Sequence, residues 1–167
     1  SDGSTFVNPI ICSKKTKKEL HENLLFFYTG LTRVSSADEI LTKTSSFLKN
    51  NKKKRLLVKK LVSLTDEMRL SLEQDDLEYF GYLLNEGWMT KRKTQNSISN
   101  GYIDEWYRIA ILNGAVGGKL CGAGSGGFLT FYAPKEKHKK IINSLPNLRH
   151  IPINLEPQGS RIIYVGE

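Results

Sequence analysis

Residues 117–133 read GGKLCGAGSGGFLTFYA, a glycine-rich run that leads into a short apolar segment. Seven of the chain's 14 glycines fall between positions 114 and 127. Residues without a Cβ allow positive φ angles and close backbone approach, so successive N–H groups in such a run can face an anion. The apolar residues 128–133 predict a buried strand. We therefore interpret residues 117–127 as a loop that connects a helix to a strand and that suits a phosphate.

Two common phosphate-binding motifs do not fit this run. The P-loop requires a glycine five residues before its Gly-Lys pair and Ser or Thr after it, and these positions hold Asn113 and Leu120. Gly122, Gly124 and Gly127 match a G-x-G-x-x-G spacing, but the dinucleotide fingerprint follows a strand and opens a helix. Here the order is reversed. The alternative to phosphate binding is a turn in which the glycines serve tight packing only.

Hydrophobic periodicity predicts helices on the N-terminal side of this run. Apolar residues at 57, 61, 64, 68 and 72 form one stripe, which indicates an amphipathic helix that faces the core. A second helix, capped by Asp75 or Asp76, is predicted over about residues 77–92, and a third from Ser99 or Asn100 to Asn113. A further helix is expected over about residues 36–49.

Strand patterns lie toward both ends of the chain. Residues 24–29, followed by Gly30, predict a strand buried on both faces, and residues 6–11 predict an edge strand or extended lead-in. Pro134 starts a short amphipathic helix to about residue 145, and two strands are expected at 150–155 and 161–165. This order predicts an α+β fold, a ferredoxin-like plait elaborated with extra helices.

Composition limits the class of protein. The chain has 167 residues, 25 Lys+Arg and 17 Asp+Glu, a formal charge of +8, and its 39% hydrophobic content excludes a disordered polyelectrolyte. No apolar run approaches the roughly 20 residues of a membrane span, and the lysine runs lack the aromatic strands of RNA-binding domains. We therefore expect no membrane and no specific nucleic acid as partners. Two cysteines and three histidines make no zinc pattern and fit a reducing, cytoplasmic setting.

Residues 119–128, KLCGAGSGGF, resemble the third conserved motif of the GHMP small-molecule kinases, a family that includes galactokinase, homoserine kinase, mevalonate kinase and phosphomevalonate kinase. Residues 28–33 (YTGLTR), 88–91 (WMTK) and 6–9 (FVNP) are similar to the C-terminal half of the family's kinases for D-glycero-D-manno-heptose 7-phosphate, with fucokinases next. The C-terminal domain of this family is a ferredoxin-like plait. The resemblance thus implies the fold that the element order predicts independently.

The resemblance also implies a sugar kinase of which this chain is one part. It implies ATP-dependent phosphorylation of the anomeric hydroxyl of heptose 7-phosphate, with ATP and Mg²⁺ as cofactors, for capsule or other surface glycans. The family's P-x-G-L-G-S-S loop and catalytic carboxylate lie in an N-terminal domain, and the loop does not occur in this sequence. We expect residues 1–23 to be a lead-in strand and linker from such a domain. Residues 24–167 would be the C-terminal domain, inactive without its N-terminal half.

Two alternatives remain open: a fucokinase-like or galactokinase-like kinase for an unphosphorylated sugar, and a non-catalytic anion-binding module. The resemblance implies no catalytic residue and no metal ligand in this chain. It assigns an active-site loop beside the ATP phosphates to Lys119, Gly122, Ala123, Gly124, Ser125, Gly126 and Gly127.

Substrate-binding candidates follow the strand at 24–29 or end the helix at 77–92, where polar groups and cations can hold a phosphate. They are Thr29, Gly30, Arg33, Lys91 and Arg92. The simpler interpretation of the basic side chains is that they are ordinary cations at helix ends, and for Lys119 that it is a surface lysine. Trp88 is expected to lie in the core. Cys121 is expected to be a packing residue, because no histidine stands in a context that suggests a Cys-His pair.

Overall fold

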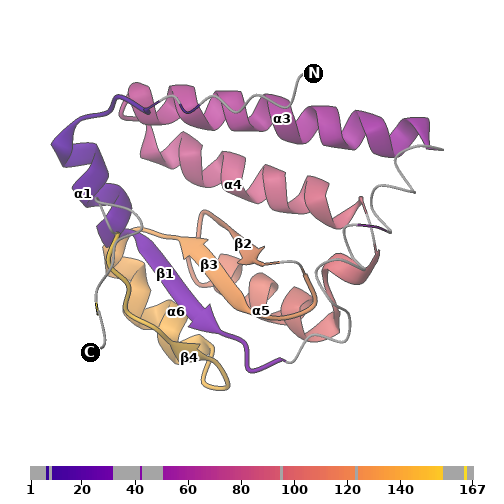
Figure 1. Ribbon diagram of the computed structural model, residues 1–167. Helices are drawn as coiled ribbons and strands as arrows, with labels where there is room; N and C mark the ends of the chain where they lie inside the picture. The colour runs from indigo at the N-terminus through magenta and orange to yellow at the C-terminus, as the bar shows by residue number, and fades with distance from the viewer. Residues whose placement is uncertain are drawn as a thin grey trace.

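The computed structural model describes Val7, residues 9–31, Thr42, residues 51–94, 96–122 and 124–155, and Tyr164. A small sheet lies among helices that precede, separate and follow its strands (Figure 1). In chain order the elements are α1 (Lys14–Glu22), β1 (Leu24–Tyr28), α3 (Lys52–Glu73), α4 (Leu77–Arg92), the 3-10 turn η1 (Asn96–Ile98), α5 (Gly101–Leu112), β2 (Gly117–Cys121), β3 (Phe128–Tyr132), the 3-10 turn η2 (Lys135–Lys137), α6 (His138–Ser144) and β4 (Arg149–His150).

The sheet has the strand order β2-β3-β1-β4, and each neighbouring pair is antiparallel. β1 pairs with β3 along its whole length, from Leu24 opposite Tyr132 to Tyr28 opposite Phe128. The first and third strands are therefore central, and the second and fourth form the edges. This is the order of a ferredoxin-like plait, so the predicted α+β class and fold are confirmed.

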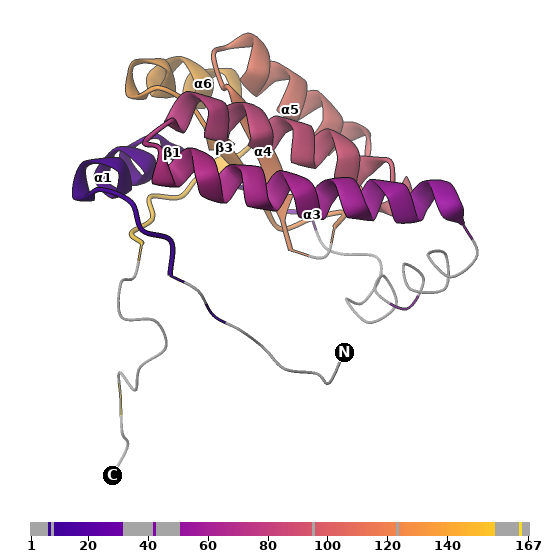
Figure 2. The ribbon, with the colours of Figure 1, turned by 90° about the horizontal axis from the view of Figure 1, so that it is seen from above.

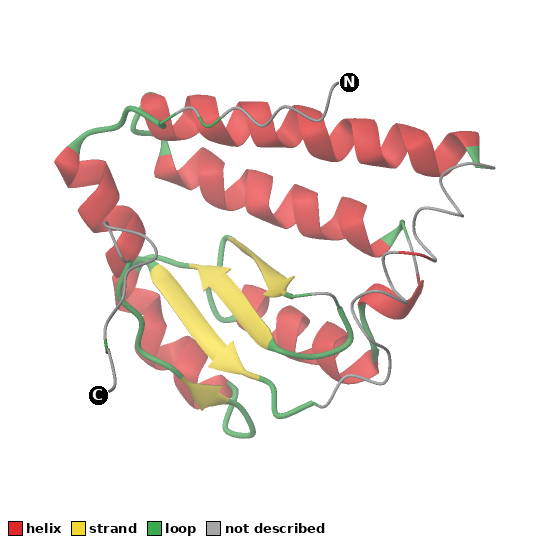
Figure 3. Ribbon diagram, viewed as in Figure 1, coloured by secondary structure: helices red, strands yellow, loops and turns green. Residues whose placement is uncertain are grey.

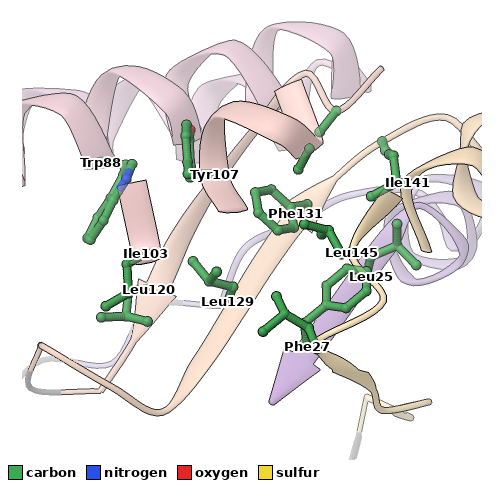
Figure 4. Packing of buried hydrophobic residues seen from close by; sticks show 14 of the residues in the cluster. Leu25, Phe27, Trp88, Ile103, Tyr107, Leu120, Leu129, Phe131, Ile141 and Leu145 are labelled. Atoms are coloured by element: carbon green, nitrogen blue, oxygen red, sulfur yellow. The ribbon is translucent and has the colours of Figure 1, made fainter. Parts of the chain in front are cut away.

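One face of the sheet carries the hydrophobic core. Leu25 and Phe27 of β1 lie opposite Phe131 and Leu129 of β3, and Leu120 of β2 lies opposite Leu129, so these side chains share a face. Helices α5 and α6 lie behind that face and contact each other (Figures 1 and 2). They complete the core with Ile103, Tyr107 and Ile141, which Figure 4 shows, and with Ala110. Burying this apolar surface is the main force that holds the helices on the sheet.

The opposite face of the sheet is less covered. Phe26 is half-buried, while Tyr28 and Phe128 are exposed and form an aromatic pair with ring centroids 5.4 Å apart. The prediction that the strand at 24–29 is buried on both faces is therefore wrong in its second half. Its apolar outer residues pair with each other rather than with a second layer.

The helix starts follow from side-chain caps. Asp76 and Asn100, at the starts of α4 and α5, accept a hydrogen bond from the backbone N–H three residues further on. Ser13 and Asn51 do the same for α1 and α3. The predicted helices at 77–92 and 99–113 are thus confirmed with their caps, whereas α1 was not predicted.

Helix α4 packs directly against β2, and glycines make this contact possible. A Cβ on Gly117 would lie 2.0 Å from the carbonyl oxygen of Gly81, and a Cβ on Gly81 would lie 2.6 Å from Cδ1 of Tyr132. β2 was missed in the sequence, where residues 117–127 were interpreted as a loop between a helix and a strand. The correction is that this segment starts with a strand and forms a hairpin with β3 (Figure 3). Glycine is unfavourable in strands, so the glycines that allow the close contact with α4 also make β2 hard to recognise in the sequence.

Helix α3 runs beside α4 on the side away from α5 and α6 (Figure 2). The helix itself confirms the prediction from the apolar stripe, but the stripe is only partly in the core. Leu64 is buried, while Leu57, Leu61, Met68 and Leu72 are half-buried. The stripe is only partly buried because α3 packs mainly against α4.

Three further expectations concern the chain ends. Of the two alternatives for residues 6–11, the edge strand is not found where the structure describes them, since Val7 and residues 9–11 form no strand. The strand at 150–155 shortens to Arg149–His150: Ile151 still donates to the carbonyl of Phe26 at 2.8 Å, but Pro152 has no N–H to continue the ladder. The helix at 36–49 and the strand at 161–165 lie outside the described residues, apart from Thr42 and Tyr164.

Candidate functional site

The turn of the β2–β3 hairpin has an unusual backbone. Gly122, Gly124 and Gly127 have φ angles of 108°, 113° and 113°, and Ser125 has a φ of 60°. The glycines adopt this region at little cost, whereas Ser125 needs outside support to stay there. Contacts from two distant segments of the chain supply that support.

The first support comes from the end of β1. The hydroxyl of Thr29 donates to the carbonyl of Gly127 at 2.9 Å and accepts from the N–H of Gly127 at 3.2 Å, and the N–H of Thr29 also donates to that carbonyl. Thr29 is buried, so these bonds are shielded from water. Gly126 lies against the same segment: a Cβ there would be 2.5 Å from the carbonyl oxygen of Leu31. The C-terminal end of the loop is therefore clamped to β1.

The second support comes from η1 and the start of α5. The N–H of Ser125 donates to the carbonyl of Ile98 at 3.1 Å, and its hydroxyl donates to the carbonyl of Ser97. The side-chain amide of Asn100 donates to the carbonyl of Ser125 at 3.3 Å. These bonds fix Ser125 in its positive-φ conformation. The hydroxyl proton of Ser125 is already donated to the carbonyl of Ser97, so it does not serve a ligand.

A pocket of about 320 Å³ opens beside this loop. Helices α3 and α4 form its apolar walls, which include the buried indole of Trp88 on α4, and the side chain of Leu120 contributes from β2. Gly122 and Gly124 bring the loop backbone to the pocket, and Lys119 and Lys91 are its charged lining residues. The loop and the end of α4, which lie apart in the sequence, thus meet at one pocket.

Arg92 lies in different surroundings from its neighbour Lys91. It lines a second, shallower hollow with Met89, Ser99 and Asp104. Its guanidinium forms an ion pair with the carboxylate of Asp104 at 2.7 Å, and the hydroxyl of Ser99 donates to the same carboxylate at 2.6 Å. This pair joins the end of α4 to the first turn of α5.

The structure divides the predicted site residues into three groups. Lys91, Lys119, Gly122 and Gly124 line the pocket. Thr29, Ser125, Gly126 and Gly127 hold the loop in place, and Gly30 follows β1 with a φ of 67°. Arg92 belongs to the ion pair with Asp104, and Arg33 and Ala123 lie outside the described residues.

The contribution of α3 to the pocket was not predicted from the sequence. Leu61, Thr65 and Met68 line the pocket opposite the loop. Their periodicity indicated an apolar face, but periodicity does not say which distant segment that face meets. Trp88 was expected to be a packing residue, and its indole is both buried and part of the pocket wall.

Charge determines what this pocket can hold. Its lining contains two lysines and no acidic residue, so it attracts anions and offers no carboxylate to a metal ion. The described residues contain no group of three His, Cys, Asp or Glu side chains placed to bind a metal. Behind the pocket, Tyr107 donates to Asn85 at 2.8 Å, and burial raises the pKa of this tyrosine well above its ordinary value. The described helices include none long and apolar enough to cross a membrane.

These features agree with comparisons to known proteins. The family model described as "GHMP kinases C terminal" matches residues 68–149, which include the end of α3 from residue 68, α4, η1, α5, the β2–β3 hairpin and α6. Residues 68–149, just under half of the chain, therefore match the C-terminal domain of the GHMP kinases, and the plait topology agrees with this match. The resemblance inferred from residues 119–128 is thereby confirmed.

Particular relatives are more distant. The chain is 27% identical over 139 residues to the D-glycero-alpha-D-manno-heptose 7-phosphate kinase of Campylobacter jejuni, covering 83% of this chain and 40% of that protein. It is 28% identical over 137 residues to the bifunctional fucokinase/GDP-fucose pyrophosphorylase of Arabidopsis thaliana, covering 81% of this chain and 13% of that protein.

Among solved structures, L. major mevalonate kinase in complex with R-mevalonate has the same fold. Its TM-score is 0.68 at 20% identity, and the match covers 76% of this chain and 40% of that one. A D-glycero-D-manno-heptose 1-phosphate kinase structure from Bacteroides thetaiotaomicron matches with a TM-score of 0.52 at 19% identity, covering 88% of this chain and 37% of that one. The chain therefore spans about two fifths of the length of these kinases.

Proposed function

We propose that this chain acts as the C-terminal domain of an ATP-dependent sugar-phosphate kinase. The substrate would be D-glycero-D-manno-heptose 7-phosphate, phosphorylated at its anomeric hydroxyl. The observation that carries the proposal is the glycine hairpin turn, clamped by Thr29 and Ser125 and placed beside two lysines. The similarity to the Campylobacter jejuni heptose 7-phosphate kinase supports the choice of substrate.

In the proposed reaction, the anomeric oxygen forms a bond to the γ-phosphorus of ATP, the bond to the bridging oxygen of ADP breaks, and the hydroxyl proton is released. Catalysis of this step depends on positioning and on neutralising charge. The rigid turn would position the backbone of Gly122 and Gly124 beside the transferred group, and Lys119 would offset its negative charge.

The two cofactors fit the described residues differently. Phosphate oxygens of ATP suit a lining of backbone amides and lysines. Mg²⁺ prefers carboxylate oxygens, and the described pocket lining has none, so we assign the metal and most of ATP to the proposed N-terminal half. The domain division at residues 23 and 24 remains part of this proposal, as does a cytoplasmic location.

The test uses the full product of the reading frame that encodes this chain. With ATP and heptose 7-phosphate we expect ADP and a heptose bisphosphate, identified by phosphorus NMR. Turnover of fucose or galactose but not of heptose 7-phosphate would favour the alternative kinase, which the fucokinase relative supports. Absence of turnover with all three sugars would contradict a kinase and leave an anion-binding module. For the substrate phosphate, Arg33→Ala is expected to raise KM for heptose 7-phosphate.

The loop has its own test in the same protein. Gly124 has a φ of 113°, and a Cβ there would lie 3.2 Å from Cα of Ile98, so Gly124→Val must displace the turn. We expect kcat to fall about 100-fold in a folded protein, because small displacements of positioning groups have effects of this order. Gly101→Ala is the matched control, since a Cβ at Gly101 meets nothing within 4 Å. Unchanged kcat in a folded Gly124→Val variant would contradict the role of the loop.

A further inference from the structure

The pocket beside the glycine turn has a lining that a sugar does not explain. Leu61 and Met68 of α3, Leu84 of α4 and the indole of Trp88 make most of its wall apolar. Thr65, the hydroxyl residue of α3 in this lining, already donates its proton to the carbonyl of Leu61 at 2.9 Å. A polyhydroxylated chain lying along this apolar wall would lose water there, and the side chains of the wall offer few hydrogen bonds in return, which is unfavourable. An apolar group would gain free energy from the same burial.

The charges at this pocket favour a doubly charged anion. Lys91 and Lys119 are exposed, and among the described residues neither forms an ion pair. Other lysines do so, for example Lys60 with Glu86 at 3.0 Å. A phosphate monoester carries a charge between about −1.5 and −2 at neutral pH, which matches two ammonium groups better than a single carboxylate does.

The volume limits the size of the ligand. At about 320 Å³ the pocket stands at the small end of the range of roughly 300–1,000 Å³ found for ligand sites. A single ring with one phosphate is of suitable size. A nucleotide or a lipid would extend well beyond these walls.

We propose that this pocket binds a compact monophosphate ester of an apolar group. The phosphate lies at Lys91 and Lys119, and the apolar part lies against Met68 and Trp88. This binding needs neither ATP nor a second domain, so it can be measured separately from the proposed phosphoryl transfer, although both use Lys119 beside the glycine turn. It also separates this ligand from the heptose phosphate, whose carbon chain is hydroxylated throughout.

The experiment titrates the 167-residue chain with phenyl phosphate and follows tryptophan fluorescence. The chain has two tryptophans, Trp88 in the pocket wall and Trp106 on α5, so the variant Trp106→Phe makes the emission report on the pocket. Inorganic phosphate, phenol and heptose 7-phosphate are the comparison probes. We expect phenyl phosphate to bind at least about tenfold more tightly than each of them, because only phenyl phosphate uses both the wall and the lysines. Equal binding of inorganic phosphate or heptose 7-phosphate, or no binding of phenyl phosphate, would overturn the proposal.

Matched variants test the two halves of the site. Lys91→Gln and Lys119→Gln should each weaken phenyl phosphate binding about tenfold, and Lys139→Gln, which removes an exposed charge on α6, should leave it unchanged. Met68→Gln should weaken phenyl phosphate but not inorganic phosphate. Circular dichroism verifies that each variant is folded. If the pocket variants behave like Lys139→Gln, the binding site is wrong, whatever the outcome of the kinase assay.

Discussion

Thr29 connects two parts of the chain that are 98 residues apart. Its hydroxyl both donates to and accepts from Gly127, and its own N–H completes the clamp. The C-terminal end of the loop thus depends on one buried side chain with a hydroxyl. A threonine after an apolar strand indicates a polar group at the strand end, but the sequence does not reveal that its partner is the glycine loop.

Thr29→Val keeps the shape of the side chain and removes its hydroxyl. The N–H of Gly127 then loses its hydroxyl acceptor, and we expect the free energy of unfolding to fall by about 1–3 kcal/mol. Urea denaturation measures this change. Thr29→Ser keeps the hydroxyl and should retain most of the stability; if the two variants are equally stable, the clamp contributes nothing.

Tyr107 gives the molecule a specific response to alkaline pH. Burial raises its pKa above the ordinary value of 10.0, so the folded state keeps a proton that the unfolded state releases. Its stabilising effect is present below pH 10 and is lost as pH rises above that value. In Tyr107→Phe, we expect the free energy of unfolding to fall less steeply between about pH 9.5 and 11. Equal slopes in the two proteins would contradict this.

At the scale of elements, the contact between α4 and β2 depends on glycine. In Gly117→Ala the new Cβ would meet the backbone oxygen of Gly81, which cannot move without displacing α4. We expect a loss of about 1–3 kcal/mol in the free energy of unfolding. Gly87 lies in α4 with open space around it, so Gly87→Ala should instead raise the free energy of unfolding by about 0.5–1 kcal/mol. Thermal and urea unfolding compare the two, and a neutral Gly117→Ala would show that the helix shifts freely.

The elements differ in how well the sequence predicts them. Helices α4 and α5 were predicted because their caps, Asp76 and Asn100, and their periodicity are local features. β2 was not predicted because its glycines are required by the close contact with α4, and a sequence pattern does not show such a tertiary contact. β4 ended early because pairing stops before Pro152.

At the scale of the whole molecule, α3 stands apart from the core. The cluster of buried hydrophobic residues draws on β1, α4, α5, β2, β3 and α6, and within the described residues it includes none from α3. Such an element can open without unfolding the rest. Amide hydrogen exchange should therefore be faster in residues 57–70 of α3 than in α5. Equal protection of the two helices would contradict this independence.

The candidate site was predictable only in part at this scale. The loop and Lys91 were identified from local motifs, and the pocket that unites them is closed by α3, whose lining residues lie about fifty positions before the loop. The formal charge of +8 proved less informative than the placement of two lysines without an acidic neighbour in the pocket lining.

The double clamp on the glycine turn has a consequence for transplanting it. One support is 98 residues away at Thr29 and the other is 28 residues away at Ser97, so a synthetic peptide of residues 117–132 would lack both. Grafting the hairpin onto another scaffold would therefore transfer its sequence and not the backbone conformation of its turn. The smallest unit that can be exchanged between kinases with this turn intact includes β1, η1 and the hairpin together.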